Sequence, residues 1–591
     1  MGTGRSTDSQ GEAREFECMA KKVRAPGGER GPWAAGSLAK LVLAATVVSP
    51  AAMPLAAAAA PSTDAGSLLR DYGNIPPKLP EAPAAKSDLA PARVVGDGVK
   101  VTVRSFQVEG VTVLPAETVQ AALAAYVGRP LAMADLDQAA ADVGKLYRDA
   151  GYYARAYFPE QNIGETIVLR VVEGRFTSVE VVGDGTHLDR AEGVKYIENS
   201  QVQGEAVDTA TLDRILMVMD DLPGVGARGV LVPGSHPGET RLQLKLTDKP
   251  RLAGGLSFDN FGSRTTGRYR AVGSLDYNSP LFLGDQAALV ALASRGTRYG
   301  RLAYSIPLGY SGLRGGVSFS GLTYELGEEF ESLDAHGSAL TVGGNLVYPM
   351  TRSDAFNWFL GTSYDHKKFD NLSSGSTTSE YSIDVLSGTL YGNLYDGILG
   401  GGYNSWSINT NVGRVDLDGS PNQSSDEQGT QTQGAYAKFY ASASRLQHLY
   451  DAFSLYASVS GQLANKNLDS SERFALGGPS GVRGYPSNEA SGDSGLLMNL
   501  ELRYLAAEGF QVAGFYDEGR TRLMHDPHGD QINGYSLRSL GAYAAWSQDG
   551  YMAKLTYAHR VGDNPGEDAS GRDNDGGHIE NQLWLQLGVQ F

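Results

Sequence analysis

The sequence predicts a mainly β protein in which two small β-α-α-β-β modules precede an antiparallel transmembrane β-barrel of about 16 strands. Three observations predict this fold. Glycine is abundant, at 75 of 591 residues, and most of the 30 tyrosines lie in the C-terminal part of the chain. Segments in that part alternate strictly between apolar and polar residues, as barrel strands do. The connections between these segments alternate between long and short.

Composition excludes several other classes of protein. The formal net charge is −17, which opposes a nucleic-acid binder, because such a protein needs a basic patch. Cys18 is the only cysteine, so no intrachain disulfide and no cysteine-based metal cluster can form. The histidines show no pairing at helical spacing and no phosphate-binding loop occurs. We therefore expect no cofactor, no metal and no catalytic group.

Residues 1–60 have the features of a secretory signal peptide. Basic side chains from Lys21 to Lys40 precede a short apolar stretch, Leu41–Val48, and an alanine run, Ala56–Ala60. The apolar stretch is too short to span a bilayer, and no stretch of transmembrane length follows it. The exported chain is therefore either soluble or an outer-membrane barrel.

Residues 61–100 are rich in alanine and proline and cannot bury a core, so they predict an extended linker. Within this linker, Ser67–Tyr72 favours a short helical turn. Whether that turn belongs to a helix that plugs the barrel stays open.

Residues 101–174 and 175–249 repeat one plan of a strand, two helices and two strands. In the second helix of the first copy, apolar residues recur at intervals of three and four, which forms one apolar stripe. Neither copy contains a catalytic constellation, which favours a binding role. The predicted elements are Val101–Glu109, Ala116–Tyr126, Ala134–Ala150, Ala154–Pro159 and Thr166–Val172, then Ser178–Val182, Ala191–Asn199, Asp208–Leu222, Gly229–Val232 and Thr240–Leu246.

Residues 250–591 predict the barrel. At roughly 20 residues per strand with its connection, this region accommodates about 16 strands. The last connections alternate strictly between long and short, which a transmembrane barrel requires and a soluble sandwich does not. The C-terminal strands are predicted at Phe453–Ala464, Leu496–Leu505, Phe510–Gly519, Ser536–Ser547, Gly550–His559 and Asn581–Phe591.

One acidic loop sequence invites a metal-binding interpretation. Asp573-Asn574-Asp575-Gly576 carries carboxylates in a turn, but the spacing and terminal glutamate of an EF-hand loop are missing. The sequence therefore predicts a solvated acidic external loop rather than a calcium site.

Two spaced motifs carry a resemblance to a known family. Gly481-Val482-Arg483-Gly484-Tyr485 lies in the long connection before Leu496, and Phe515-Tyr516-Asp517-Glu518-Gly519 lies on a later strand. With two modules ahead of the barrel, the chain resembles the outer-membrane transporters of two-partner secretion, the TpsB group (ShlB/FhaC/HecB-like) of the POTRA-barrel superfamily. The first motif is similar to that family's VRGY tip on the sixth external loop, and the second to its F-x-D-x-G strand.

The physics of these motifs can be argued without the family. Asp517 must face the lumen, because lipid would not tolerate its charge, and Phe515 shares its face. A lumenal carboxylate favours a planar guanidinium, which forms a bidentate pair. Gly481 and Gly484 permit a tight backbone that aims Arg483 inward. We hypothesise that the Arg483–Asp517 pair pins the loop inside the barrel. The site residues are Val482, Arg483, Gly484 and Tyr485 on the loop, and Phe515, Asp517 and Gly519 on the wall.

The resemblance implies an outer-membrane transporter with POTRA domains in the periplasm. Its partner would be a large secreted protein, such as a haemolysin or filamentous adhesin, recognised unfolded through an exposed sheet edge of the first module within Val101–Ile163. The barrel contacts outer-membrane lipid, and no nucleic acid is involved. Two alternatives remain, a barrel-assembly factor of the BamA type and a passive porin or receptor. An enzyme fits least.

Overall fold

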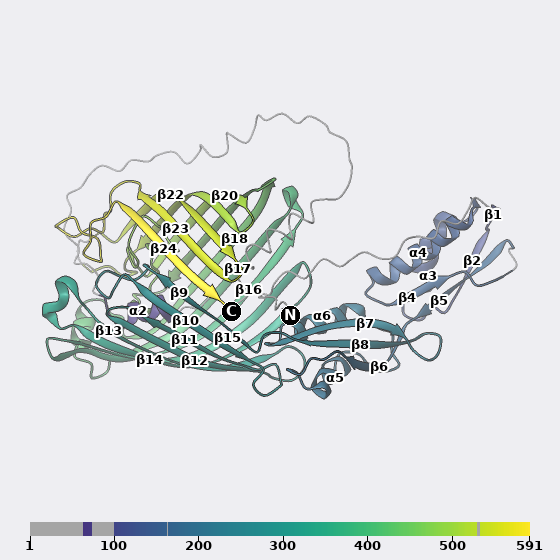
Figure 1. Cartoon of the computed structure of the whole chain (residues 1–591), viewed down its shortest axis with the longest axis horizontal. Helices are drawn as coiled ribbons and strands as arrows, with labels where there is room; N and C mark the ends of the chain where they lie inside the picture. The colour runs from purple at the N-terminus through teal and green to yellow at the C-terminus, as the bar shows by residue number, and fades with distance from the viewer. Residues whose placement is uncertain (1–62, 74–99, 162–163, 529–531) are drawn as a thin grey trace, which may run out of the picture.

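The computed structural model describes residues 63–73, 100–161, 164–528 and 532–591. The chain is elongated, with a barrel at one end and an arm of two small modules at the other (Figure 1). The predicted signal peptide, 1–60, and most of the predicted linker, 61–100, lie outside the described residues.

A closed barrel of sixteen antiparallel strands, β9–β24, occupies the C-terminal region, and β24 pairs with β9 to close it. This confirms the predicted fold class. The strands are β9 Leu252–Asp259, β10 Arg270–Asn278, β11 Gln286–Ala293, β12 Thr297–Pro307, β13 Arg314–Glu325, β14 His336–Thr351, β15 Phe356–Ser373, β16 Ser376–Asp396, β17 Gly402–Asp416, β18 Gly434–Tyr450, β19 Phe453–Ala464, β20 Ser494–Ala507, β21 Phe510–Arg522, β22 Gly534–Gln548, β23 Tyr551–Arg560 and β24 Asn581–Gln590.

The two ends of the barrel differ. Connections at one end are all short, such as the two residues between β20 and β21. The other end carries the long connections, such as 465–493, together with two short ones, between β11 and β12 and between β15 and β16. The arm enters β9 at the end with the short turns. We call the two ends the turn end and the loop end.

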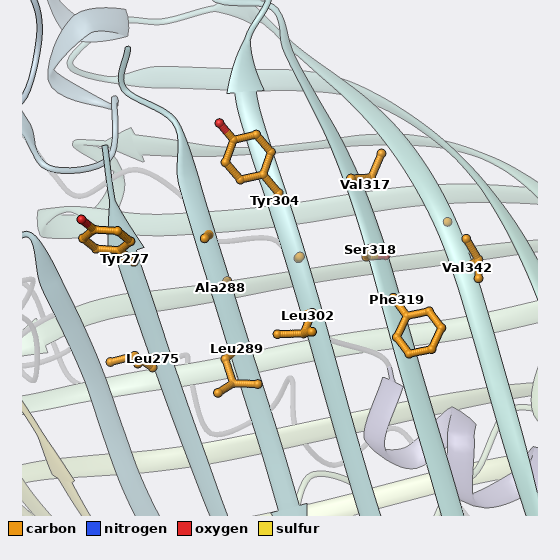
Figure 2. Close-up of a pocket in the computed structure, with 13 residues that line it drawn as sticks. Leu275, Tyr277, Ala288, Leu289, Leu302, Tyr304, Val317, Ser318, Phe319 and Val342 are labelled. Atoms are coloured by element: carbon orange, nitrogen blue, oxygen red, sulfur yellow. The ribbon is translucent and has the colours of Figure 1, made fainter. Parts of the chain in front are cut away.

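Alternating residues divide the barrel wall into an apolar outer face and a mixed inner face. Leu496, Met498 and Leu500 are exposed on the outside of β20, whereas Leu497 is buried inside. The outer face of β10–β14 carries an apolar hollow of about 610 Å³, where Leu275, Leu289 and other side chains point away from the lumen (Figure 2). Such a surface suits lipid chains and is separate from the lumen.

The first module packs two helices, α3 Ala116–Leu123 and α4 Met133–Asp149, against a three-stranded sheet of order β2-β5-β4. The sheet consists of β2 Ser105–Glu109, β4 Ala154–Tyr157 and β5 Thr166–Glu173. The single strand predicted over Val101–Glu109 is wrong in detail. A separate strand, β1 Val101–Thr102, pairs with β3 Pro130–Leu131, and only β2 pairs with β5. The break occurs where Arg104 and Ser105 turn their amides to the carbonyl of Glu165.

The second module repeats the plan with a sheet of order β6-β8-β7 and two helices, α5 and α6. Its core joins Leu212, Ile215 and Met219 of α6 to Leu242 and Leu244 of the sheet. The elements are β6 Arg175–Val182, α5 Arg190–Glu198, α6 Thr209–Asp220, β7 Val225–Pro233 and β8 Glu239–Asp248.

The second module is docked firmly onto the turn end of the barrel. Arg352 follows β14 and forms a bidentate ion pair with Asp221, with nitrogen–oxygen distances of 2.7 and 3.0 Å. Arg352 also donates a 2.7 Å hydrogen bond to the buried amide oxygen of Asn357 on β15. Tyr310, in the β12–β13 turn, donates a 2.9 Å hydrogen bond to Glu192. These contacts fix the direction in which the arm leaves the barrel.

The lumen holds two inserted segments, the connection 465–493 and helix α2, Ala65–Gly73. The short helical turn expected at Ser67–Tyr72 falls within α2. Among the described residues, no helix combines the length and the apolar character needed to cross a membrane.

Candidate functional site

The tip of the connection 465–493 is buried in the lumen. Val482 and Tyr485 have no exposed surface, and Arg483 is only 5% exposed. The amide of Val482 donates to the carbonyl of Leu476 at 2.7 Å, which folds the connection back on itself. A Cβ at Gly481 would collide with the carbonyl of Leu476, and one at Gly484 would press on Ser539, so this path requires glycine at both positions.

Arg483 and Asp517 are in contact. The Nη2 and Nε atoms of Arg483 lie 2.6 and 2.9 Å from the two carboxylate oxygens of Asp517, and the amide of Arg483 donates to the same carboxylate at 3.1 Å. The guanidinium carbon also lies 3.5 Å from the centroid of the Phe515 ring. Gly519 leaves room on the wall for Leu476 and Val482. All seven sequence-predicted site residues therefore meet at one place.

Several residues at this site were missed by the sequence analysis. Glu501 on β20 accepts a 2.7 Å bond from Nη1 of Arg483, so the guanidinium contacts two carboxylates. Asn499 and Ser539 donate to Asp517 at 2.8 and 3.0 Å. Trp584 on β24 donates to the carbonyl of Arg483 at 2.8 Å. The available signal was the polar inward face of β20, where Glu501 lies between Asn499 and Arg503.

Arg560 at the end of β23 links the tip to the last external loop. Its Nε donates to the carbonyl of Gly484 at 3.2 Å, and its guanidinium lies 4.5 Å from the centroid of the Tyr485 ring. The same guanidinium forms an ion pair with Asp573. The expectation that Asp573-Asn574-Asp575-Gly576 is solvated is therefore wrong. Asp573 and Asp575 are 2% and 7% exposed, because the loop folds down onto Arg560 and the tip.

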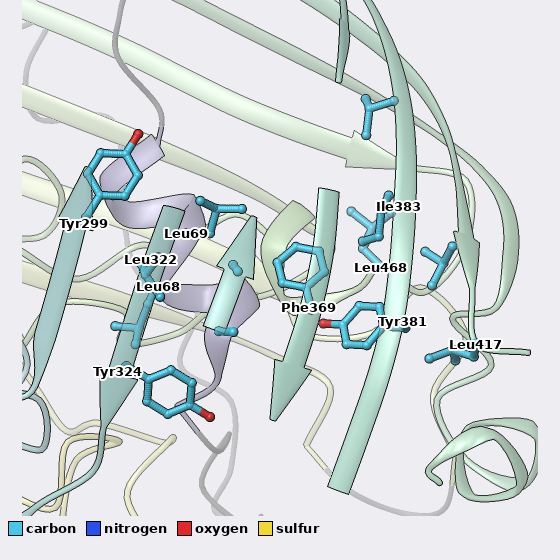
Figure 3. Packing of buried hydrophobic residues seen from close by; sticks show 14 of the residues in the cluster. Leu68, Leu69, Tyr299, Leu322, Tyr324, Phe369, Tyr381, Ile383, Leu417 and Leu468 are labelled. Carbon is cyan, nitrogen blue, oxygen red and sulfur yellow. The ribbon is translucent and has the colours of Figure 1, made fainter. Parts of the chain in front are cut away.

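Helix α2 occupies the lumen beside the connection 465–493. Its apolar face, with Leu68 and Leu69 fully or nearly buried, packs on a lumenal cluster of barrel side chains (Figure 3). At its N-terminus the amide of Ala65 donates to Asn371 at 3.0 Å, and Ser470 donates to Asp64 at 2.8 Å. The cluster includes Tyr299, Leu322, Tyr324, Phe369, Tyr381, Ile383, Leu417 and Leu468.

Polar contacts tie the helix to the connection 465–493. Arg70 donates a 2.7 Å hydrogen bond to Ser491 and a 3.2 Å bond to the carbonyl of Ser470, and it also contacts Asn488. At the base of the same connection, Glu472 is paired with Lys367 at 2.6 Å and Lys438 at 2.8 Å. The buried charge of Glu472 is therefore neutralised in place.

The sheet of the first module exposes two edges. Each of the strands β2 and β4 pairs with β5 alone among the strands that the structure describes. At the end of β5, Glu173 anchors the module. Burial raises the pKa of this carboxyl, but hydrogen bonds from Thr112, Val113 and Tyr147 outweigh burial, so the pKa lies below its usual value.

The structure combines a 16-stranded barrel, a loop folded back into its lumen and a docked arm of α/β modules. Together these features define the class of outer-membrane β-barrel transporters that carry POTRA domains. The chain belongs to the haemolysin secretion/activation protein ShlB/FhaC/HecB family, whose sequence model matches residues 238–541. A second model, the ShlB-type POTRA domain, matches residues 101–174.

Relatives support the same assignment. The heme/hemopexin transporter protein HuxB of Haemophilus influenzae strain 86-028NP is 27% identical, over 78% of this chain and 82% of its own. The outer membrane transporter CdiB of Dickeya dadantii strain 3937 is 25% identical, over 68% and 72% of the two chains. The solved structure of CdiB from Escherichia coli has the same fold, with a TM-score of 0.65 and 19% identity, over 85% of this chain and 93% of that chain.

The chain is therefore a two-partner secretion transporter of the outer membrane, with its POTRA arm in the periplasm. The family is described as haemolysin secretion/activation proteins, and the relatives include a heme/hemopexin transporter and the hemolysin transporter ShlB of Serratia marcescens. The turn end of the barrel faces the periplasm, because the arm leaves from it, and the loop end faces outward.

Proposed function

We propose that this transporter exports a large secreted partner, such as a haemolysin or filamentous adhesin, which it receives unfolded in the periplasm. Residues 101–174 and 175–249 act as two POTRA domains, and 250–591 as the conduit, after a signal peptide at 1–60 and a linker at 61–100. The single observation that supports recognition is the pair of free sheet edges in the first module. An extended chain can add a strand to such an edge through backbone hydrogen bonds, with little demand on sequence.

Two features of the arm favour entry at the first module. Strand β2 lies toward the far end of the arm, away from the barrel (Figure 1). The second module is held against the barrel by Arg352 and Asp221, so its orientation is fixed. A partner bound at the first module is therefore aligned with the second module and the turn end.

Site-specific cross-linking tests this proposal. The chain has one cysteine, Cys18, within the predicted signal peptide, so a single introduced thiol reports one position. We expect cross-links to the partner from Gln107→Cys on β2 or Ala156→Cys on β4, and none from Glu117→Cys on the exposed face of α3. Equal cross-linking from α3, or none from either edge, contradicts strand addition.

We also propose that Arg483 and Asp517 hold the loop tip in the resting transporter, and that the tip rearranges within the lumen, without leaving the barrel, when a partner passes. The pair is buried and bidentate, so it keeps one geometry until the surrounding lumen changes. Deletion of the gene is expected to remove one secreted protein from culture supernatants. Loss of many outer-membrane proteins instead would favour the assembly-factor alternative.

A further inference from the structure

The outward face of β21 and β22 changes character near the loop end. From the turn end, Phe510 and Tyr516 are exposed apolar side chains on the outside of β21. Beyond Tyr516 the same face continues with Glu518, Arg520 and Arg522, and Arg538 of β22 lies directly across from Glu518. Three guanidinium groups and one carboxylate therefore lie just above the apolar band that contacts lipid. We call these three arginines the outer arginine patch.

The contacts of this patch leave it with excess positive charge. Arg538 pairs with Glu518 at 3.1 Å, and the hydroxyl of Tyr516 donates to the second oxygen of that carboxylate at 3.1 Å. Arg522 donates a 3.2 Å hydrogen bond to the carbonyl of Met524, which fixes its side chain without neutralising it. Among the described residues, none accepts a hydrogen bond from the exposed guanidinium of Arg520.

Other outward cations near the loop end are single: Lys368 and Arg414 each have a carboxylate beside them, and Arg298 on β12 lies across from Ala293 and Thr323. Lys368 on β15 is paired with Glu380 at 2.9 Å, and Arg414 on β17 stands directly across from Asp384 on β16. In a chain whose formal net charge is −17, a local excess of positive charge at one height on the wall is distinctive. This contrast indicates an anionic occupant from the membrane rather than from the protein.

We propose that the outer arginine patch binds the phosphate groups of a phosphorylated lipid headgroup in the outer leaflet. Arginine suits phosphate, because its planar fork can donate two hydrogen bonds to one group. The height also fits, since Tyr516 and Leu540 would contact the lipid's acyl chains directly below the patch. The opposite face of β21 carries Phe515 and Asp517, so a bound lipid braces the strand that holds the loop tip.

Lipid retention by the purified full-length protein tests the inference. We expect native mass spectrometry to detect bound bis-phosphorylated lipid A, and little of the same lipid without its phosphates. The variant Arg520→Gln/Arg522→Gln is expected to bind the lipid about a hundredfold more weakly, since it removes two charge-assisted contacts and each corresponds to about a tenfold change. The control Arg298→Gln/Arg414→Gln changes outward arginines on other strands and is expected to retain the wild-type amount.

The proposal is overturned if the wild type binds lipid A with and without its phosphates equally well. It is also overturned if the control loses as much bound lipid as the double variant does. If inorganic phosphate alone stabilised the protein against heat as much as bis-phosphorylated lipid A does, the patch would be assigned to free phosphate. That result would also overturn the proposal. If the double variant does not form a barrel, the comparison of the two lipids on the wild-type protein still decides whether the phosphate groups are recognised. The inference depends on membrane orientation and not on the exported partner, so it can fail while the proposed recognition stands.

Discussion

The loop tip and helix α2 both fill the lumen, but different forces hold them. The tip is held by buried charge, because Arg483 contacts the carboxylates of Asp517 and Glu501. The helix is held mainly by apolar packing, in which Leu68 and Leu69 contact the lumenal cluster. The tip is also anchored covalently at both ends, by β19 and β20.

This difference separates a permanent part of the barrel from a removable one. Breaking a buried ion pair costs about 3–5 kcal/mol, because one charge is left without compensation. Burying a leucine contributes about 1.5–3 kcal/mol, and helices of fewer than about 12 residues are marginal in water. The nine-residue α2 can therefore leave the lumen at moderate cost, whereas the tip cannot leave without stranding Asp517.

The largest expected effect is that of Asp517→Ala. The variant leaves Arg483 with Glu501 alone, and we expect the tip to lose about 3–5 kcal/mol of local stability. Protease sensitivity of the connection 465–493 should rise, and secretion of the partner should fall at least about tenfold. Both are measured on intact cells, by loop proteolysis and by assay of the supernatant.

The matched control is Asp396→Ala, which breaks another bidentate arginine–carboxylate pair, that with Arg445, at the turn end of the barrel. We expect this control to leave the connection protease-resistant. Unchanged secretion and unchanged protease resistance in Asp517→Ala would contradict the assignment of the tip as a permanent part of the barrel.

A smaller effect is expected from Leu68→Asn/Leu69→Asn. Placing two amides against the lumenal cluster removes the apolar contacts of α2, so the helix should leave the lumen and single-channel conductance in planar bilayers should rise. Thermal stability of the barrel should stay within about 1 kcal/mol, because the strands keep their pairing.

Leu399→Asn is the control for this prediction, since it makes the same chemical change at a turn residue that is 83% exposed. Unchanged conductance in the double variant would show that apolar packing is not what retains the helix. A collapse of barrel stability would show that the helix, like the tip, is a permanent part of the structure.

The sequence predicts the barrel and the positions of its last six strands well, because alternation and connection length are local signals. It also brings Arg483 and Asp517 together, since a charge on a barrel strand must face the lumen and needs a counter-ion. Predicted and observed bounds differ by a few residues at most strands, as for Phe510–Gly519 against Phe510–Arg522.

What the sequence does not predict depends on contacts between distant strands. Trp584 reaches the tip only because β24 closes the barrel against β9, and Arg560 buries Asp573 only because the last loop folds inward. The position of α2 is set by Tyr299, Phe369 and their neighbours on separate strands. No local pattern of residues carries that information.

The smallest effect is expected at the point where the two regions touch. Arg70 forms one of the polar links between α2 and the connection 465–493, through Ser491 and the carbonyl of Ser470. Arg70→Met keeps the length of the side chain and removes its donors, which costs about 1 kcal/mol, or about a fivefold shift in occupancy of the lumen by the helix. Conductance should therefore rise slightly, while the loop tip stays protease-resistant, because Arg483 and Asp517 are untouched.

Arg70→Lys is the control and should recover part of the effect. If Arg70→Met exposes the loop to protease as much as Asp517→Ala does, the helix and the tip are one cooperative unit, and the distinction between a removable and a permanent part is wrong.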